Sequence, residues 1–206
     1  MSFYAERILP HLIDVACSTR PSRKQREKIV PFAEGDVLEI GFGSGLNLPF
    51  YDARRVRKIW GLEPSEGMRR KARPMLEALD LDVELIDLPG ESIPLEANSV
   101  DTVLVTYSLC TIADVLSALE GMRRMLKPGG SLLFCEHGLA PDARVRQWQR
   151  RLNPAWSRLA GGCNLHRDIP DLITTGGFRL TVDERMYIPG IRMLCYNYWG
   201  RAEVAR

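Results

Sequence analysis

The sequence of 206 residues lacks a long apolar run, and no stretch approaches the roughly 20 residues that a membrane-spanning helix needs. Charged and polar residues (Glu6, Arg7, His11 and Asp14) interrupt the first apolar stretch, so we expect no signal peptide. Internal repeats and low-complexity tracts are also missing. The length fits one domain, because domains usually contain about 100–200 residues.

Cysteine is scarce, and its spacing is unlike that of a cross-linked protein. The five cysteines are odd in number, and none belongs to a Cys-x-x-Cys pair. This pattern argues against a disulfide framework and against structural zinc, and it favours a reducing compartment. We therefore predict a cytoplasmic protein without a metal site. The positions are Cys17, Cys110, Cys135, Cys163 and Cys195.

A large excess of charge of one sign is absent as well. The 28 basic and 26 acidic residues give a formal charge of +2, which is too small to imply a nucleic-acid partner. The sequence also has no Asn/Asp-Pro-Pro-Tyr/Phe segment after the fourth expected strand, where it would hold a flipped base. We expect no nucleic acid among the partners.

A glycine-rich loop is the most informative feature that is present. An aliphatic run ends in Gly41, Gly43 and Gly45, and Glu63 closes the next apolar run. A strand, a glycine-rich turn and an acid on the neighbouring strand form the adenosine site of doubly wound α/β sheets. The dinucleotide fingerprint needs its third glycine five residues after the first, where Leu46 stands, and no P-loop Lys-Ser/Thr pair follows. The loop predicts a nucleoside ligand without phosphates, of which S-adenosylmethionine is the common one.

Apolar runs and helical periodicities alternate through most of the chain. Strands are expected at 36–41, 58–63, 83–87, 101–107 and 131–137, and the helices between them at 46–51, 65–79 and 114–126. This alternation predicts a mostly parallel sheet with right-handed crossovers. Amphipathic spacing predicts a helix over 4–17, followed by a basic segment, 20–28, and residues 127–130 (Lys-Pro-Gly-Gly) predict a turn before the fifth strand.

The last third follows another pattern. Helices are expected at 142–159, where Pro154 should kink or interrupt the helix, and at 169–175. Two strand-like runs, 178–188 and 191–199, are separated by only two residues, so they predict an antiparallel hairpin. We predict a single doubly wound, Rossmann-like α/β domain over 1–206, with a mostly parallel seven-stranded sheet and a C-terminal antiparallel hairpin. Its parts are an N-terminal helical cap (1–31), a cofactor-binding core (36–137) and a substrate-side helix with the terminal hairpin (140–206).

Several short segments resemble a known family. With the glycine loop, 61–64 (Gly-Leu-Glu-Pro) and 123–130 (Arg-Arg-Met-Leu-Lys-Pro-Gly-Gly) resemble class I S-adenosylmethionine-dependent methyltransferases. More specific segments resemble the methyltransferase-like family of animal microsomal alkyl thiol S-methyltransferases and their soluble bacterial relatives, over residues 22–200. These are 109–111 (Leu-Cys-Thr), 136–137 (Glu-His), 153–156 (Asn-Pro-Ala-Trp) and 162–165 (Gly-Cys-Asn-Leu). Two departures from that family are visible: a short amphipathic helix is expected where its microsomal members carry a hydrophobic N-terminal anchor, and Glu63 stands where Asp is usual.

The residues expected to contact the cofactor lie in or after the first four strands. Glu63 should accept the ribose hydroxyls, and residues 90–92 follow the third strand, where this fold usually contacts adenine. Glu39, a carboxylate among aliphatic neighbours, is expected to anchor the glycine loop or the methionine amino group. The candidates are Glu39, Gly41, Gly43, Gly45, Glu63, Pro64, Met68, Gly90, Glu91, Ser92, Tyr107 and Ser108.

Two residues are candidates for a part in catalysis. Tyr107, at the end of the fourth strand, is expected to lie near the transferable methyl or to be an ordinary core aromatic. His137, at the end of the fifth strand, is either a general base, since an ordinary histidine pKa near 6.5 suits neutral pH, or a structural histidine. Methyl transfer is an in-line displacement whose leaving group is a neutral thioether, so no metal is required. A thiol with a pKa near 8.5 needs little help from a base.

The predicted function is methyl transfer to a small molecule, most simply a thiol. One alternative is N- or C-methylation of a lipid-like substrate, such as a phospholipid amine or quinone precursor, with peripheral membrane contact through the N-terminal and arginine-rich helices. The other is a non-catalytic S-adenosylmethionine-binding protein, because intact cofactor motifs do not demonstrate turnover. The oligomeric state and the identity of the acceptor stay open.

Overall fold

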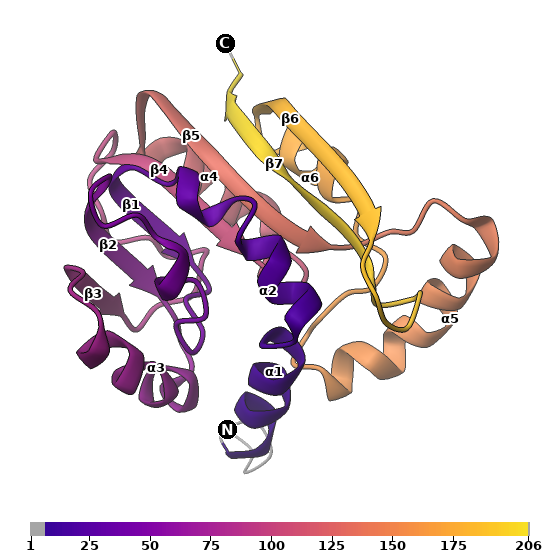
Figure 1. Cartoon of the computed structure of the whole chain (residues 1–206). Helices are drawn as coiled ribbons and strands as arrows, with labels where there is room; N and C mark the ends of the chain where they lie inside the picture. The colour runs from indigo at the N-terminus through magenta and orange to yellow at the C-terminus, as the bar shows by residue number, and fades with distance from the viewer. Residues whose placement is uncertain (1–6, 206) are drawn as a thin grey trace.

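The centre of the structure, a computed structural model that describes residues 7–205, is a seven-stranded sheet (Figure 1). The strand order is β3-β2-β1-β4-β5-β7-β6. The strands are β1 (Gly35–Ile40), β2 (Val56–Leu62), β3 (Val83–Ile86), β4 (Val100–Thr106), β5 (Leu126–His137), β6 (Phe178–Tyr187) and β7 (Tyr196–Val204). The first five pair in parallel, whereas β7 runs antiparallel to both β5 and β6. The predicted fold class is confirmed.

Six α-helices accompany the sheet in the described part of the chain. In three of them, α3, α4 and α6, the side chains of Ser65, Asp114 and Asp168 cap the N-terminus. Each accepts a hydrogen bond from a backbone N–H of the first turn, which has no partner within the helix. Among residues 7–205 we find no helix whose length and apolar character would allow it to cross a membrane. The helices are α1 (Leu9–Cys17), α2 (Arg20–Arg26), α3 (Glu66–Ala78), α4 (Val115–Met125), α5 (Ala143–Leu159) and α6 (Ile169–Thr175). Residues 4–6 of the predicted first helix lie outside the described residues.

Alternate residues of each central strand pack on opposite faces of the sheet. On one face, residues such as Leu38, Val103 and Phe134 pack with the buried side of α4 and α6. On the other, residues such as Val37 and Leu104 pack with the segment before β1 and with α3. Both faces are covered, which explains why the strands read as nearly continuous apolar runs in the sequence.

Two predicted boundaries are wrong in an informative way. Residues 46–51 form only a 3₁₀ turn, η3 (Leu48–Phe50), because the chain becomes extended at Tyr51 while the side chains of Asn47 and Tyr51 both reach back to Glu39. The hairpin exists, but β7 begins at Tyr196 rather than at residue 191. Residues 188–195 form the connection, which is closed by a hydrogen bond from Ile188 N–H to the Cys195 carbonyl (2.9 Å).

Two proline-containing segments also differ from expectation. The Lys-Pro-Gly-Gly segment, 127–130, lies inside β5 as an irregularity rather than before it as a turn. In the pairing of β4 with β5, Val100 lies opposite Leu126 and Thr102 lies opposite Ser131, so the pairing skips residues 127–130. Helix α5 continues through Pro154 to Leu159 without interruption.

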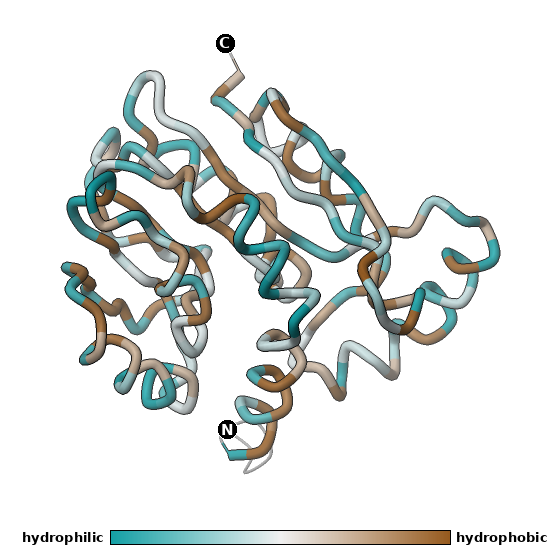
Figure 2. Tube along the Cα trace, viewed as in Figure 1, coloured by the Kyte–Doolittle hydropathy of each residue, from teal (hydrophilic) through white to brown (hydrophobic). Residues whose placement is uncertain are grey.

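Figure 1 shows helix α1 and the C-terminus at opposite ends of the molecule. Figure 2 shows α1 as largely apolar, and Leu12 and Val15 on it are 54% and 69% exposed.

Candidate active site

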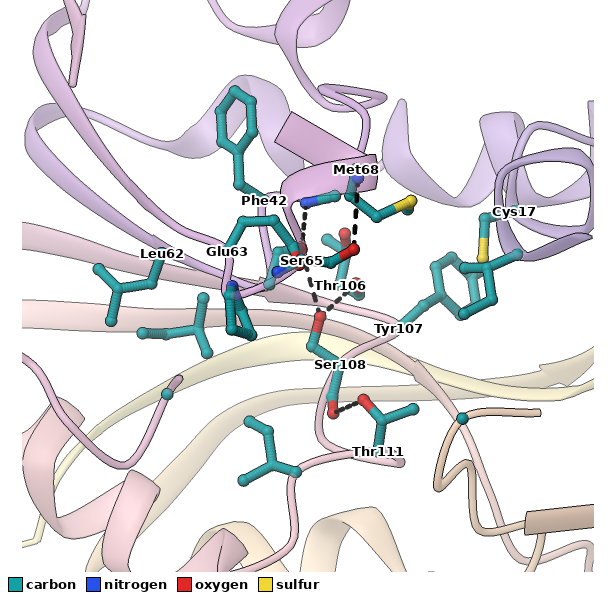
Figure 3. Close-up of a pocket in the computed structure, with 18 of the residues that line it drawn as sticks. Cys17, Phe42, Leu62, Glu63, Ser65, Met68, Thr106, Tyr107, Ser108 and Thr111 are labelled. Atoms are coloured by element: carbon teal, nitrogen blue, oxygen red, sulfur yellow. Dashed lines mark hydrogen bonds between the residues drawn. The ribbon is translucent and has the colours of Figure 1, made fainter. Parts of the chain in front are cut away.

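A cavity of about 380 Å³ opens at the carboxyl ends of β1, β2 and β4, where the strand order reverses (Figure 3). Ligands of doubly wound sheets bind at such a switch point, and the volume lies in the usual range of small-molecule sites, about 300–1,000 Å³. Most of the predicted cofactor residues line this cavity: Gly41, Gly43, Glu63, Pro64, Met68, Gly90, Glu91, Tyr107 and Ser108. Glu39, Gly45 and Ser92 do not line it, and neither does His137.

The glycine loop forms one wall because its backbone adopts conformations that side chains disfavour. Gly41, Gly43 and Gly45 have φ angles of +71°, +61° and +80°. A Cβ at Gly41 would lie 2.0 Å from Ser108 Oγ, so the first glycine permits close packing of two loops. A Cβ at Gly43 would meet no protein atom closer than 3.4 Å (Met68 Cε), so it would project toward the cavity that Gly43 lines.

Glu63 connects the glycine loop to the start of α3. One carboxylate oxygen accepts a hydrogen bond from Gly43 N–H (2.9 Å), and the other accepts one from Ser65 N–H (2.8 Å). The side chain is 8% exposed, and burial raises the pKa of Glu63 although the two amides oppose this change. Figure 3 shows Glu63 and Ser65 on one side of the pocket, with Tyr107 and Cys17 on the other. Each oxygen retains a lone pair that can accept a ribose hydroxyl.

Glu39 lies below the loop rather than in the cavity. Its oxygens accept hydrogen bonds from Asn47 Nδ2 (2.8 Å) and from the Tyr51 hydroxyl (2.6 Å). Asn47, which lines the cavity, also donates to Thr106 Oγ1 (3.0 Å). These contacts favour the loop-anchoring interpretation of Glu39. Burial raises the pKa of Glu39 to about 7.

Glu39 should make the stability of the protein depend on pH. A buried carboxyl with a raised pKa stabilises the fold fully below its ordinary value of 4.5, and this contribution is lost as pH rises toward about 7. The loss is on the order of 3 kcal/mol. Burial raises the pKa of Glu136 to about 7 as well, so both groups act in the same window. We expect Glu39→Gln to gain unfolding free energy relative to wild type as pH rises from 5 to 8 in urea titrations, because the variant lacks this titrating carboxyl. The exposed Glu184→Gln is the control, and equal slopes in Glu39→Gln and wild type would refute the assignment.

The loop after β3 and the start of α3 form the second wall. Gly90 and Glu91 line the cavity, and a Cβ at Gly90 would lie 2.9 Å from Ile40 Cγ2. Glu91 Oε1 accepts a hydrogen bond from Asp114 N–H (3.2 Å), which ties this loop to the start of α4. Pro64 and Met68 complete this side. Of the segment predicted to contact adenine, Gly90 and Glu91 therefore line the cavity, and Ser92 does not.

Tyr107 and Ser108 form the floor at the end of β4. Tyr107 has a φ angle of +54°, a strained conformation for a residue with a side chain. Its hydroxyl donates to Asn197 Oδ1 (2.8 Å), and burial raises the pKa of Tyr107 well above 10, so the hydroxyl stays protonated. Backbone amides of Ser108 and Leu109 both donate to Glu136 Oε1, at 2.6 and 3.0 Å. Glu136 thus fixes the turn that carries Tyr107 into the cavity wall.

His137 contacts a cysteine instead of the cavity. Its Nε2 lies 3.2 Å from Cys163 Sγ, and its Nδ1 is buried without a hydrogen-bond partner among the described residues. Burial would lower the pKa of His137, but the Cys163 thiolate outweighs burial and raises it. Hydrogen bonding from Cys110, together with the imidazole, lowers the pKa of Cys163 well below its ordinary value, although burial opposes this change. The arrangement does not bring His137 to an acceptor in the cavity.

The N-terminal helix supplies a wall that sequence reasoning missed. Leu9, Pro10 and Ile13 of α1 line the cavity together with the glycine loop. The Asp14 carboxylate joins the two, because it accepts hydrogen bonds from Ser44 Oγ (2.5 Å) and from Lys71 Nζ (3.1 Å). The apolar spacing of α1 was visible in the sequence, but no local signal showed that Asp14 would pair with the glycine loop.

We expect Asp14→Ala to loosen α1 and to weaken S-adenosylmethionine binding by about 3- to 10-fold. The carboxylate is partly exposed, so its two hydrogen bonds contribute toward the lower end of the usual range for charged groups. Calorimetry gives the affinity, and hydrogen exchange reports the opening of α1. Combining the substitution with Ser44→Ala in a double-mutant cycle isolates that contact. Unchanged exchange in α1 would show that Asp14 does not hold the helix over the cavity.

Solved structures share this architecture at low sequence identity. The chain resembles a Thermotoga maritima protein described as a S-adenosylmethionine-dependent methyltransferase, possible histamine N-methyltransferase, with a TM-score of 0.66, 21% identity and 96% coverage of both chains. It also resembles the methyltransferase CalH in complex with S-adenosylhomocysteine, with a TM-score of 0.64, 22% identity, and coverage of 96% of this chain and 59% of that one. These similarities concern the fold.

A family model described as "Methyltransferase domain" matches residues 38–134. This segment contains the glycine loop, Glu63 and the turn at the end of β4. Residues 38–134 form a class I methyltransferase domain. At the level of the family, this confirms the prediction of S-adenosylmethionine as the cofactor. Residues at the ends of the parallel strands and in the loops that follow them line most of the cavity, and residues of α1 complete it.

Curated relatives extend the similarity in sequence. The thiol S-methyltransferase TMT1B of Rattus norvegicus is 34% identical over 139 residues, which cover 66% of this chain and 56% of the relative. The ubiquinone/menaquinone biosynthesis C-methyltransferase of Campylobacter jejuni is 28% identical over 136 residues, 66% of this chain and 48% of the relative. The chain thus spans about half the length of these relatives.

Proposed function

We propose that this protein transfers the methyl group of S-adenosylmethionine to a small-molecule thiol. The observation that carries the proposal is Arg26, a guanidinium that lines the cavity while only 4% exposed. It donates to the Cys17 carbonyl (2.7 Å) and lies 5.0 Å from the centre of the Tyr107 ring. Within residues 7–205 no carboxylate forms an ion pair with it, and its Nε is buried without a partner.

A buried cation beside the acceptor position selects the charge of the acceptor. It stabilises a thiolate and lowers the pKa of a bound thiol by about 1–3 units, whereas it repels an ammonium group. A thiol already supplies some thiolate at neutral pH, so the thiolate attacks the sulfonium methyl without a dedicated base. The new sulfur–methyl bond forms as the bond to the sulfonium sulfur breaks, which leaves neutral S-adenosylhomocysteine. The similarity to the thiol S-methyltransferase TMT1B agrees with this acceptor class.

Turnover with methyl-labelled S-adenosylmethionine and separate panels of thiols, amines and phenols tests the proposal. We expect label in thiols and a rate at least about 10-fold lower on amines of similar size, since the cation disfavours a positively charged acceptor. Equal or faster labelling of amines would contradict the acceptor class. Binding of S-adenosylhomocysteine without labelling of any panel would support the non-catalytic alternative.

Arg26→Gln should reveal the effect of the cation on the acceptor. At pH 7 we expect the rate on a thiol to fall by about 10-fold or more, because the bound thiol regains its ordinary pKa. The rates of variant and wild type should converge as pH rises above that pKa. Arg26→Lys keeps the charge and should recover part of the rate at pH 7. A pH-independent loss in Arg26→Gln would instead assign Arg26 to packing against Tyr107.

A lipid-like acceptor is the second candidate, and the exposed apolar side of α1 favours it. Ile8, Leu12 and Val15 are 42%, 54% and 69% exposed. Sedimentation with liposomes of neutral and anionic lipids measures membrane binding directly. Membrane binding that Leu12→Asp abolishes would support a lipid-like acceptor. A cytoplasmic location stays a prediction from the cysteines, which are free in the structure.

A further inference from the structure

Three potential metal ligands that lie far apart in the sequence meet beside the cavity. Cys110 follows β4, His137 ends β5, and Cys163 lies in the loop after α5. One ligand atom from each lies within 4.8 Å of the other two. We propose that Cys110, His137 and Cys163 form a binding site for one Zn²⁺ ion, with a fourth coordination position left for an exchangeable ligand. This inference does not depend on the nature of the methyl acceptor.

The separations of the donor atoms suit zinc. Bonds of about 2.3 Å to sulfur and about 2.0 Å to nitrogen place neighbouring ligands of a tetrahedral ion roughly 3.5–3.8 Å apart. His137 Nε2 and Cys163 Sγ are 3.2 Å apart, so an ion can enter with small adjustments of the side chains. Two sulfurs and one imidazole form a soft ligand set of the kind that selects zinc over magnesium or calcium. Three protein ligands leave the fourth position open, as in zinc sites that exchange a ligand.

The backbone around the cluster is already fixed. Asn164 N–H and Asn164 Nδ2 both donate to the Cys110 carbonyl, at 2.8 and 3.2 Å. Asn153 of α5 donates to Asn164 Oδ1 (3.1 Å) and accepts from Leu165 N–H (2.8 Å). These bonds hold the segment that carries Cys163 against the turn that carries Cys110. A preformed site of this kind binds its ion with little reorganisation.

Burial and charge also fit an ion. Cys110 and Cys163 are 2% and 9% exposed, and a zinc ion bound by two thiolates and a neutral imidazole carries no net charge. A neutral unit avoids the large cost of burying an unpaired charge. Thr111 and Gly161, close in sequence to the two cysteines, line the cavity, so the ion would lie near its wall. The absence of Cys-x-x-Cys pairs led to the expectation of no metal, because spacing along the chain does not reveal ligands that the fold assembles.

Metal binding is tested on the full chain, kept reduced, stripped with a chelator and titrated with Zn²⁺ against a chromophoric competitor. We expect one Zn²⁺ per chain, and Co²⁺ in its place should show thiolate-to-metal absorption with the visible bands of a tetrahedral site. Cys163→Ser and Cys110→Ser should each weaken Zn²⁺ binding by more than about 100-fold, since losing even a group that only orients a ligand costs about 10–100-fold. Cys195→Ser, in the connection between β6 and β7, should bind like wild type.

X-ray absorption of the zinc-loaded wild type gives a readout that survives if the variants fail to fold. The proposal predicts two sulfur ligands and at least one nitrogen, at about 2.3 and 2.0 Å. Zinc bound equally well by wild type and a folded Cys163→Ser, a spectrum with only oxygen and nitrogen ligands, or no stoichiometric binding would overturn it. The cofactor affinity of the same samples, measured by calorimetry, reports separately on the methyltransferase proposal.

Discussion

Glu63→Ala should weaken S-adenosylmethionine binding by about 10²–10⁴-fold. We expect the carboxylate to accept two ribose hydroxyls, and hydrogen bonds to a charged group contribute about 1.5–3 kcal/mol each. It also accepts the Gly43 and Ser65 amides, so its removal frees the glycine loop. Titration calorimetry with S-adenosylmethionine and with S-adenosylhomocysteine measures the loss.

A graded set of variants separates the loss of contact from a loss of fold. Glu66→Ala removes a nearby carboxylate, 83% exposed on α3, and should leave the affinity unchanged. Glu63→Gln retains one acceptor oxygen and should fall between wild type and Glu63→Ala. Thermal melts without cofactor confirm that each variant is folded. An affinity of folded Glu63→Ala within a factor of two of wild type would mean that the ribose lies elsewhere.

Gly43→Val should abolish cofactor binding by occupying the space of the ligand. A Cβ at position 43 would meet no close protein atom, so the added side chain would project toward the cavity. The φ angle of +61° also strains any β-branched residue, and this strain lowers stability independently of the ligand. Binding of S-adenosylhomocysteine by calorimetry and the melting temperature report the two effects separately.

Gly129→Val provides the matched control for strain. Gly129 has a φ angle of +85°, and a Cβ at this position would meet no atom within 4 Å. It lies in the irregular segment of β5, and it does not line the cavity. We expect a similar loss of stability with normal cofactor binding. If Gly43→Val binds S-adenosylhomocysteine with wild-type affinity, the glycine loop does not line the cofactor site.

The sheet was predictable because each strand is both apolar and bounded by turn residues. Gly41 after β1 and the acid at 63 mark their strand ends directly, and short connections allow only a few topologies. The turn at 48–50 was not predictable, because the competing contact is between Glu39 and two side chains that the fold brings together. The start of β7 depends on its pairing with β5, for example Asn197 with His137, and not on the local alternation.

The cavity wall formed by the glycine loop and Glu63 was largely predictable, and the wall formed by the N-terminal helices was not. Residues such as Gly43 and Glu63 belong to one local strand-turn pattern, which carries its own geometry. Arg26 and Leu9 reach the cavity through the packing of two N-terminal helices, and no local pattern encodes that packing. The pairing of His137 with Cys163 likewise joins residues 26 positions apart in sequence, and His137 does not line the cavity beside which it was predicted.

A crystal structure of the complex with S-adenosylhomocysteine tests the central claim most directly. It should place the adenosyl moiety against residues 41–43, with both ribose hydroxyls on Glu63 and the adenine beside Gly90 and Glu91. The thioether sulfur should face the space between Tyr107, Arg26 and α1, where the acceptor enters. A ligand bound outside this cavity, or a ribose that makes no contact with Glu63, would contradict the account.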